Sequence, residues 1–321
     1  MACHLTQGER KRISELLGMG LSKSQIAAAI GRDRSTIYRE IGRNSCEGAY
    51  APVRAQRLAE QRRRDRPRQR TLDELDVNEY VRCALVRFWS PDQIAGRSGR
   101  QFPSDPRFRF SLMAVYRWID RQPDRSYWRA FLRFGKRKKP HDRRGQLKAT
   151  VHITNRPEVV DRKERFGDWE GDTVLGKQRR SALVTLTERK SGFALAGLVR
   201  RFRSANVNRQ MTQLMTPLPE KLRHTMTLDR GKECALHRLF EKRSGLQVYF
   251  ARPYHAWERG SNENFNGLLR QYFPKGTDFT RLSTREVQWA LNQLNDRPRK
   301  RLNYQTPREV LSQHFPVAIE L

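Results

Sequence analysis

The chain has 321 residues, with 65 Lys and Arg against 34 Asp and Glu, which gives a formal net charge of +31 and a pI near 11. Four dispersed cysteines without a CxxC pair argue against a disulfide framework or a zinc finger, and no apolar run reaches the ~18 residues that span a bilayer. With 37% apolar residues the chain can bury cores, and its length suggests two or three domains.

The positive charge predicts a nucleic-acid partner, because every phosphate neutralised by a basic side chain releases counterions. Composition alone leaves open a ribosomal or RNA-coating protein. The sequence has no GxxxxGK[ST] motif, so we expect no nucleotide cofactor. Without a membrane segment or signal peptide, we expect a soluble protein that works where DNA is.

Residues 5–44 have the spacing of three short helices. Thr6 followed by Glu9, and Ser22 followed by Gln25, are capping-box patterns that mark the starts of the first two helices. Gly31 then supplies a tight turn before the third helix. This order is typical of a helix-turn-helix DNA-binding domain, which we assign to residues 1–60.

The third helix begins near Asp33, and its Ile37 and Ile41 are expected to face inward. The side chains left for the major groove and its phosphates are Arg34, Ser35, Thr36, Tyr38 and Arg39. The alternative is a plain helical bundle whose basic face is solvated.

A second helical unit is predicted at 76–132, between basic linkers at 61–75 and 133–150. It contains a Ser-Pro helix start at Ser90 and a later helix, "SLMAVYRWI". The segment "AVYRWI" parallels "TIYREI" of the first unit, so that Arg117 corresponds to Arg39. We therefore expect a second helix-turn-helix-like unit in which Arg117 contacts DNA.

Residues 151–321 are expected to form an α/β domain with a mixed five-stranded sheet. Their order is three strands, a helix, a strand, a helix, a strand and a helix, which is the order of the ribonuclease H type fold. The expected strands are 166–176, 181–192, 193–201, 224–231 and 246–251, and the expected helices are 205–215, 234–243 and the stretch from 258.

Acidic residues stand out in so basic a chain, because two-metal phosphodiester chemistry needs converging carboxylates. Asp229 lies at the end of the fourth predicted strand and Glu263 on the helix after the fifth. On the first strand, Asp168, Glu170 and Asp172 share one face, so the pattern alone does not choose among them. Asp229 also fits an ordinary turn, and Glu263 also fits stabilisation of a helix start by the macrodipole.

Three blocks, "DWEGDTVLG", "TLDRGKE" and "ERGSNENFNGLLRQYFPKGTDF", resemble the Asp-Asp-Glu transposases of the insertion sequence 30 family. The N-terminal "SKSQIAAAIGRDRSTIYREIGRN", "WSPDQIAGR" and the tail "RPRKRLNYQTPREV" are also similar to that family. The resemblance covers nearly the whole chain, with 33 residues between Asp229 and Glu263.

The resemblance implies that Asp172, Asp229 and Glu263 bind two divalent metal ions, Mg²⁺ or Mn²⁺, and catalyse cleavage and strand transfer of DNA. It implies binding to terminal inverted repeats and to target DNA, with the protein acting as a homo-oligomer. Near the site, Lys232, Arg259 and Arg270 are candidates for phosphate contacts, or else solvated charges.

Two other functions remain as alternatives to the transposase. One is a helix-turn-helix regulator with an inactive integrase-like domain, against which the intact acids argue. The other is a non-specific nuclease of the ribonuclease H class that acts on hybrids, which would not need two sequence-reading units.

Overall fold

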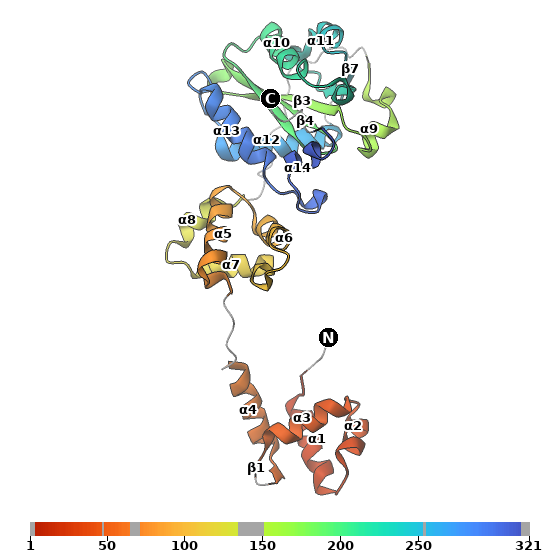
Figure 1. Cartoon of the computed structure of the whole chain (residues 1–321), viewed down its shortest axis with the longest axis vertical. Coiled ribbons are helices and arrows are strands. Elements are labelled where there is room, and N and C mark those ends of the chain that lie inside the picture. The colour runs from red at the N-terminus through yellow and green to blue at the C-terminus, as the bar shows by residue number, and fades with distance from the viewer. Residues whose placement is uncertain (1–3, 47, 65–70, 134–150, 253–254, 316–321) are drawn as a thin grey trace. The chain divides into compact units, whose positions relative to one another are not determined.

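The computed structural model describes residues 4–46, 48–64, 71–133, 151–252 and 255–315. Parts of the two predicted linkers, residues 65–70 and 134–150, lie outside these ranges. The chain divides into two compact units, residues 1–70 and 71–321 (Figure 1). Within the described residues, no helix combines the length and apolar character needed to cross a bilayer.

The first unit contains the three predicted helices and a fourth one after them. Both predicted capping boxes are confirmed, Thr6 with Glu9 and Ser22 with Gln25. Gly31 ends the second helix at φ 69°, a left-handed conformation that glycine adopts without a Cβ clash. The elements are α1 (Gln7–Gly18), α2 (Lys23–Ile30), α3 (Arg34–Asn44), β1 (Ser45–Cys46), β2 (Ala49–Tyr50) and α4 (Pro52–Arg64).

A small apolar core holds this unit together, with Ile13, Ile26 and Ile37 completely buried. Asp33 caps α3 by accepting a hydrogen bond from the Ser35 amide. Helix α4 continues through residues 61–64, the start of the segment predicted as a linker, because no Gly or Pro interrupts the chain between residues 53 and 66.

The second unit begins with a helical segment built around its own apolar core, in which Val81, Leu85, Ile94 and Trp118 are buried. Ser90 caps the helix α6 with a capping box, as the Ser-Pro pattern predicts. The elements of this segment are η1 (Thr71–Asp73), α5 (Leu75–Val86), α6 (Pro91–Gln101), η2 (Pro106–Phe108), α7 (Leu112–Arg121) and α8 (Arg125–Ala130).

A five-stranded mixed sheet follows, in the order β5-β4-β3-β6-β7. The strands are β3 (Asp168–Leu175), β4 (Ala182–Glu188), β5 (Ala194–Val199), β6 (Thr225–Leu228) and β7 (Gln247–Phe250). β3, β4 and β5 form an antiparallel meander, whereas β6 pairs in parallel with β3, and β7 in parallel with β6. This topology confirms the ribonuclease H-like fold.

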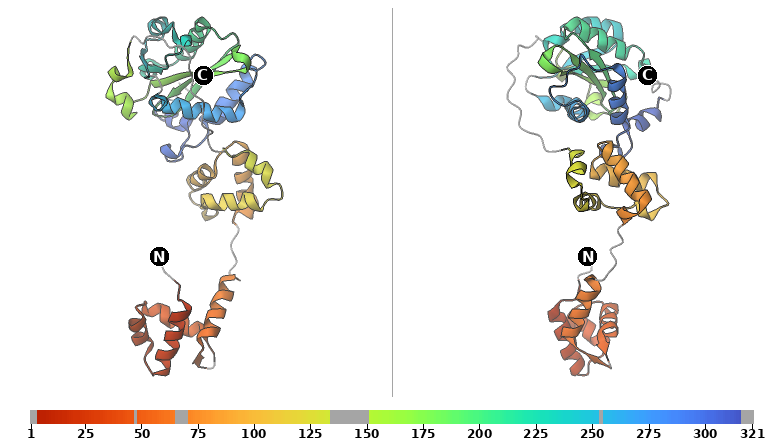
Figure 2. Two further views of the ribbon diagram at one scale, coloured as in Figure 1. Left: turned by 180° about the vertical axis from the view of Figure 1, so that it is seen from behind. Right: turned by 90° about the vertical axis from the view of Figure 1, so that its left-hand side faces the viewer.

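Helices cover both faces of the sheet (Figures 1 and 2). One core, with Trp169 and Leu186, lies beneath α10 (Ser204–Met215) and α11 (His237–Ser244). The opposite core, with Leu183 and Phe265, lies beneath α12 (Gly260–Tyr272) and α13 (Thr284–Asn295). The remaining elements are η3 (Ile153–Asn155), α9 (Glu158–Arg162), η4 (Lys177–Arg179), η5 (Glu220–Leu222), η6 (Lys232–Cys234), η7 (Ala256–Arg259), η8 (Lys300–Leu302) and α14 (Pro307–Ser312).

Candidate functional site

The register of the two central strands places Asp172 and Asp229 side by side. In the parallel pair β3 and β6, Asp168 lies opposite Thr225 and Glu170 opposite Thr227, a constant offset of 57 positions. Extending that offset by two residues brings Asp172 level with Asp229, just beyond the last residue of β6. Because side chains at matching positions of neighbouring strands point to the same face, the two carboxylates converge.

Arg259 lies against both carboxylates. Its Nη1 is 3.6 Å from Oδ1 of Asp172, and its Nη2 is 3.4 Å from Oδ2 of Asp229. Nη1 also donates a hydrogen bond to the carbonyl oxygen of Gly171. The side chains of Asp172 and Asp229 remain 25% and 35% exposed, so a ligand from solvent can reach this acidic pair.

The electrostatics of this group favour a cation. Burial raises the pKa of Asp172, the charge of Arg259 opposes that shift, and the neighbouring Asp229 adds to it. For Arg259, burial works to lower the pKa, but Asp172 and Asp229 outweigh it and the pKa is raised. Two like charges held together and partly desolvated gain free energy from any cation placed between them.

The two other acids on the same face of β3 are occupied inside the protein. Asp168 is fully buried, is paired with Arg165 and accepts a hydrogen bond of 2.7 Å from Thr225. Glu170 is buried and paired with Arg189. Asp172 is therefore the acid on this strand face that remains accessible, a choice that the sequence pattern left open.

Helix α12 runs along β3 and contacts it at every turn. Asn262 donates from Nδ2 to the carbonyl oxygen of Glu170 at 2.7 Å, and Asn266 donates from Nδ2 to Oδ2 of Asp172 at 2.9 Å. One turn further, Arg270 donates to the carbonyl oxygen of Leu175 at 3.0 Å. The spacing of four residues keeps these three side chains on one face of the helix.

Glu263 lies on the first turn of α12, half-buried and three residues before Asn266. Within the described ranges, no group of three or more His, Cys, Asp and Glu side chains is arranged so that it could hold a metal ion. The structure thus unites Asp172 with Asp229 and does not complete such a group with Glu263.

Glu233 in η6 is a nearby acid that was not predicted from the sequence. Burial and the charge of Asp229 raise the pKa of Asp172, and the charge of Glu233 raises it by a smaller amount. Thr173 donates a hydrogen bond of 3.2 Å to Oε1 of Glu233. The block "DRGKE" contains this acid, but only the turn after β6 brings it toward β3.

The predicted phosphate contacts near the acids differ in their surroundings. Lys232 is exposed. Arg259 is 16% exposed and is committed to the two aspartates. Arg270 is half-buried, with hydrogen bonds to the carbonyl oxygens of Leu175, Phe273 and Pro274, and burial lowers its pKa. Contact of these residues with DNA stays a prediction.

The predicted recognition helix α3 presents a polar, basic face. Arg34 lies over the ring of Tyr38, and Arg39 donates to the Ser35 hydroxyl at 2.6 Å. These four residues are exposed, Tyr38 at 41%, and Thr36 is half-buried. In the second unit, Arg117 on α7 is exposed beside Tyr116, which is 40% exposed.

Comparisons with known proteins agree with this architecture. Residues 3–44 match the family described as a helix-turn-helix domain. The chain is 38% identical to the transposase for insertion sequence element IS4351 of Bacteroides fragilis, over 98% of this chain and 97% of that protein. It is 36% identical to transposase InsI for insertion sequence element IS30A of Escherichia coli (strain K12), over 96% of this chain and 83% of that protein.

Among solved structures, the chain is similar to the catalytic core domain of BIV integrase. The identity is 20%, the TM-score is 0.37, and the match covers 47% of this chain and 97% of that domain.

A helix-turn-helix unit joined to a ribonuclease H-like domain with converging acids defines the class of DNA-cutting and DNA-joining enzymes. Within that class, the chain belongs to the insertion sequence 30 family of DNA transposases.

Proposed function

We propose that this transposase cuts and joins DNA at Asp172, Asp229 and Glu263, which hold two divalent metal ions. The observation that carries the proposal is the convergence of Asp172 and Asp229 on the single guanidinium of Arg259, at 3.6 and 3.4 Å. Two carboxylates that lie close enough to contact one guanidinium are also close enough to bind a metal ion together.

The donor chemistry fits Mg²⁺ or Mn²⁺, which prefer carboxylate oxygens. When bound, a pair of such ions activates the attacking oxygen and stabilises the leaving oxygen. Asn266 holds the Asp172 carboxylate in place by its hydrogen bond of 2.9 Å, and as a neutral side chain it does not compete with a cation. Glu263, one turn away on the same helix, joins the aspartates when its side chain reorients on DNA binding.

The reaction has two steps on phosphodiester bonds. Water first hydrolyses the bond at an end of the element and leaves a 3′ hydroxyl. That hydroxyl then attacks a phosphodiester of the target strand and displaces its 3′ oxygen. One acidic pair serves one strand junction at a time, so we propose that a homo-oligomer holds two ends and the target DNA together, at the nucleoid in the bacterial cytoplasm.

Recognition of the terminal inverted repeats is assigned to the exposed face of α3, with Arg34, Ser35, Thr36, Tyr38 and Arg39. The exposed Arg117 of α7 gives a second contact. The match of residues 3–44 to a helix-turn-helix domain supports this assignment.

The test is incubation of the purified protein with its element's ends and Mg²⁺, with nicks mapped at nucleotide resolution. Glu263→Gln should abolish cleavage and leave end binding within about twofold of the wild type. Glu286 is a matched control, because it also occupies the first turn of a helix, so Glu286→Gln should still cleave. Strand transfer by Glu263→Gln would refute the assignment.

The competing function is a helix-turn-helix regulator with an inactive catalytic domain. It predicts that the wild-type protein binds the ends but does not nick them in Mg²⁺ or Mn²⁺. The accessible pair Asp172 and Asp229 favours the enzyme.

A further inference from the structure

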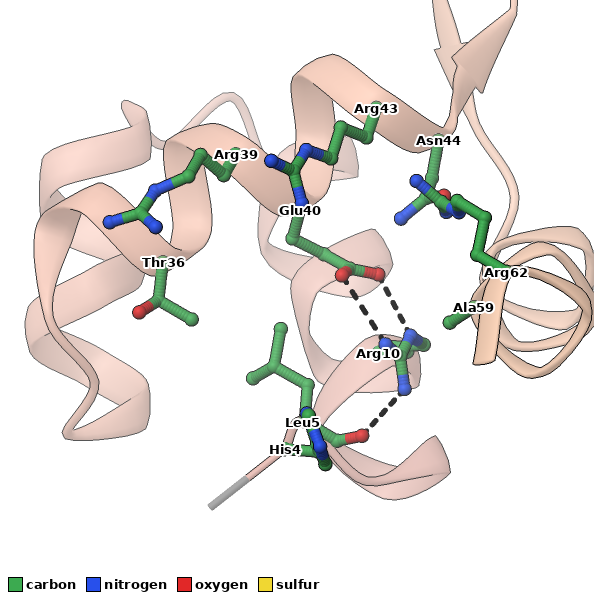
Figure 3. Close-up of a pocket in the computed structure, with 10 residues that line it drawn as sticks. All are labelled: His4, Leu5, Arg10, Thr36, Arg39, Glu40, Arg43, Asn44, Ala59 and Arg62. Carbon is green, nitrogen blue, oxygen red and sulfur yellow. Dashed lines mark hydrogen bonds and ion pairs between the residues drawn. The ribbon is translucent and has the colours of Figure 1, made fainter. Parts of the chain in front are cut away.

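The first unit contains a pocket of about 360 Å³ beside the recognition helix (Figure 3). It lies between the start of α1, one flank of α3, and α4. Its lining residues are His4, Leu5, Arg10, Thr36, Arg39, Glu40, Arg43, Asn44, Ala59 and Arg62. Helix α4 lies beyond residues 3–44, which match the helix-turn-helix family.

The floor of the pocket is a satisfied ion pair. Arg10, only 4% exposed, donates from Nε to Oε1 of Glu40 at 2.8 Å and from Nη2 to Oε2 at 3.3 Å. Its Nη1 donates to the Leu5 carbonyl oxygen and to Oε1 of Gln56. The Tyr50 hydroxyl also donates to Glu40. This acid is therefore neutralised within the fold.

The rim of the pocket is positively charged. Arg39 and Arg43 extend from α3 and Arg62 extends from α4, and all three are exposed (Figure 3). The buried Asn44 accepts a hydrogen bond from Arg62, and the Leu58 carbonyl accepts another, which fix the direction of that guanidinium. With four arginines and one glutamate, the lining has a formal charge of +3.

We propose that this pocket binds a phosphate of the DNA backbone, gripped between Arg43 and Arg62, when α3 lies in the major groove. A recognition helix in that groove has the phosphates of the groove edge along its flank. The volume of the pocket, about 360 Å³, is many times the ~30 Å³ that one water occupies in the liquid, so the pocket has room for a phosphate group. Guanidinium groups are the donors that suit phosphate oxygens best.

This inference rests on the proposed role of α3, and it extends the DNA interface to α4. A phosphate contact sets the register of the protein on the duplex and reads no base. The pocket should therefore strengthen binding to every DNA sequence by a similar factor. The side chains on the exposed face of α3, which contact the bases, would then distinguish the ends of the element from other DNA.

The experiment measures binding of the full chain to labelled duplexes by fluorescence anisotropy, over a range of salt concentrations. The duplexes are an end of the element and an unrelated sequence. The variants are Arg43→Gln, Arg62→Gln and the double variant. Arg57→Gln is the matched control, since Arg57 is exposed on the same helix as Arg62 and is not among the lining residues.

Each single variant should lower the affinity about tenfold for both duplexes, as expected for removal of a charged hydrogen bond. The slope of log K against log salt should fall by about 0.9 for each phosphate that the protein no longer neutralises. Because both arginines hold the same phosphate, the slope should fall by about 0.9 in the double variant and by part of that amount in each single variant. Arg62→Lys should recover part of the affinity, and Arg57→Gln should match the wild type.

Slopes for Arg43→Gln and Arg62→Gln equal to that of Arg57→Gln would overturn the proposal. A loss of affinity confined to the end sequence would also overturn it, because it would indicate base contacts. Thermal unfolding confirms that each variant is folded. The Arg43 side chain makes no hydrogen bond within the residues that the structure describes, so Arg43→Gln keeps the test open if Arg62→Gln unfolds. Only binding is measured, so a failure of DNA cleavage is a separate result.

Discussion

The main-chain amide of Asn262 donates a hydrogen bond of 2.9 Å to Oε2 of Glu170. The buried Glu170 of β3 thus accepts a hydrogen bond from the start of α12, where free amides and the helix dipole favour negative charge. The Asn262 side chain donates in turn to the carbonyl oxygens of Glu170 and Thr185. These bonds fix the first turn of α12, which carries Glu263, against the strand that carries Asp172.

Asn262→Ala should loosen this attachment. It leaves buried carbonyl groups without their partner, which costs about 1–3 kcal/mol of the free energy of unfolding. Cleavage should fall more than tenfold at a temperature where the variant is folded, since small displacements of a catalytic group are costly. Denaturant unfolding and the nicking assay give the two measurements.

Asn264→Ala is the matched control for Asn262→Ala. Asn264 is exposed on the same helix, and its side chain accepts a long contact of 3.4 Å from Arg133. Its loss should change stability by less than about 0.5 kcal/mol and leave cleavage near the wild-type rate. Equal cleavage by the two alanine variants would show that the attachment of Asn262 does not position Glu263.

Asp172→Asn should stabilise the protein at neutral pH in the presence of a chelator. Because the pKa of Asp172 is raised by folding, the folded state binds this proton more tightly than the unfolded chain does. The stability that the group contributes is present at low pH and is lost as the pH rises through the folded pKa. The variant should therefore melt above the wild type at pH 7, with a difference that shrinks toward pH ~4.

Asp168→Asn is the control for that pH series. It lies on the same face of β3, but its carboxylate is paired with Arg165, so neutralising it should lower the melting temperature at pH 7. If Asp172→Asn also melted below the wild type at pH 7, the charged Asp172 would stabilise the folded protein, which contradicts the prediction.

Arg259→Gln should reveal competition between this guanidinium and metal ions. Without divalent ions, the variant leaves Asp172 and Asp229 facing each other, and should lose on the order of 1–3 kcal/mol of stability. Mg²⁺ should then raise its melting temperature more than it raises that of the wild type, because a ligand that binds more tightly stabilises the folded state more at the same concentration. Lys232→Gln, at an exposed neighbour, should respond as the wild type does. An Mg²⁺ response equal in all three proteins would contradict the competition.

Local sequence rules predicted much of this structure. Capping boxes at Thr6 and Ser22 located two helices, because their hydrogen bonds join residues only three apart. The order of strands and helices gave the topology. Neither rule could assign partners distant in sequence, such as Arg189 for Glu170, or Arg259 for the two aspartates, since these depend on strand register and on how α12 packs.

The contact between α6 and the loop after η8 is another feature that no local pattern shows. The ring of Tyr304 lies directly on Gly96, where a Cβ would come within 2.3 Å of ring atoms. Around it, Arg97 pairs with Glu309 at 2.5 Å, and the Tyr304 hydroxyl donates to Asp92 at 3.2 Å. These contacts join the helical segment of the second unit to the end of its catalytic domain.

Gly96→Ala should therefore destabilise the second unit, although alanine is normally the better residue inside a helix. The added methyl group must displace the Tyr304 ring, and such overpacking costs about 1–3 kcal/mol. Gly99→Ala in the same helix is the control: its Cβ would meet only the Phe108 carbonyl oxygen at 4.0 Å, so the propensity gain of up to about 1 kcal/mol should remain. Calorimetric unfolding of both variants decides the matter, because a melting temperature for Gly96→Ala at or above that of Gly99→Ala would mean that the ring of Tyr304 does not rest on α6 in solution.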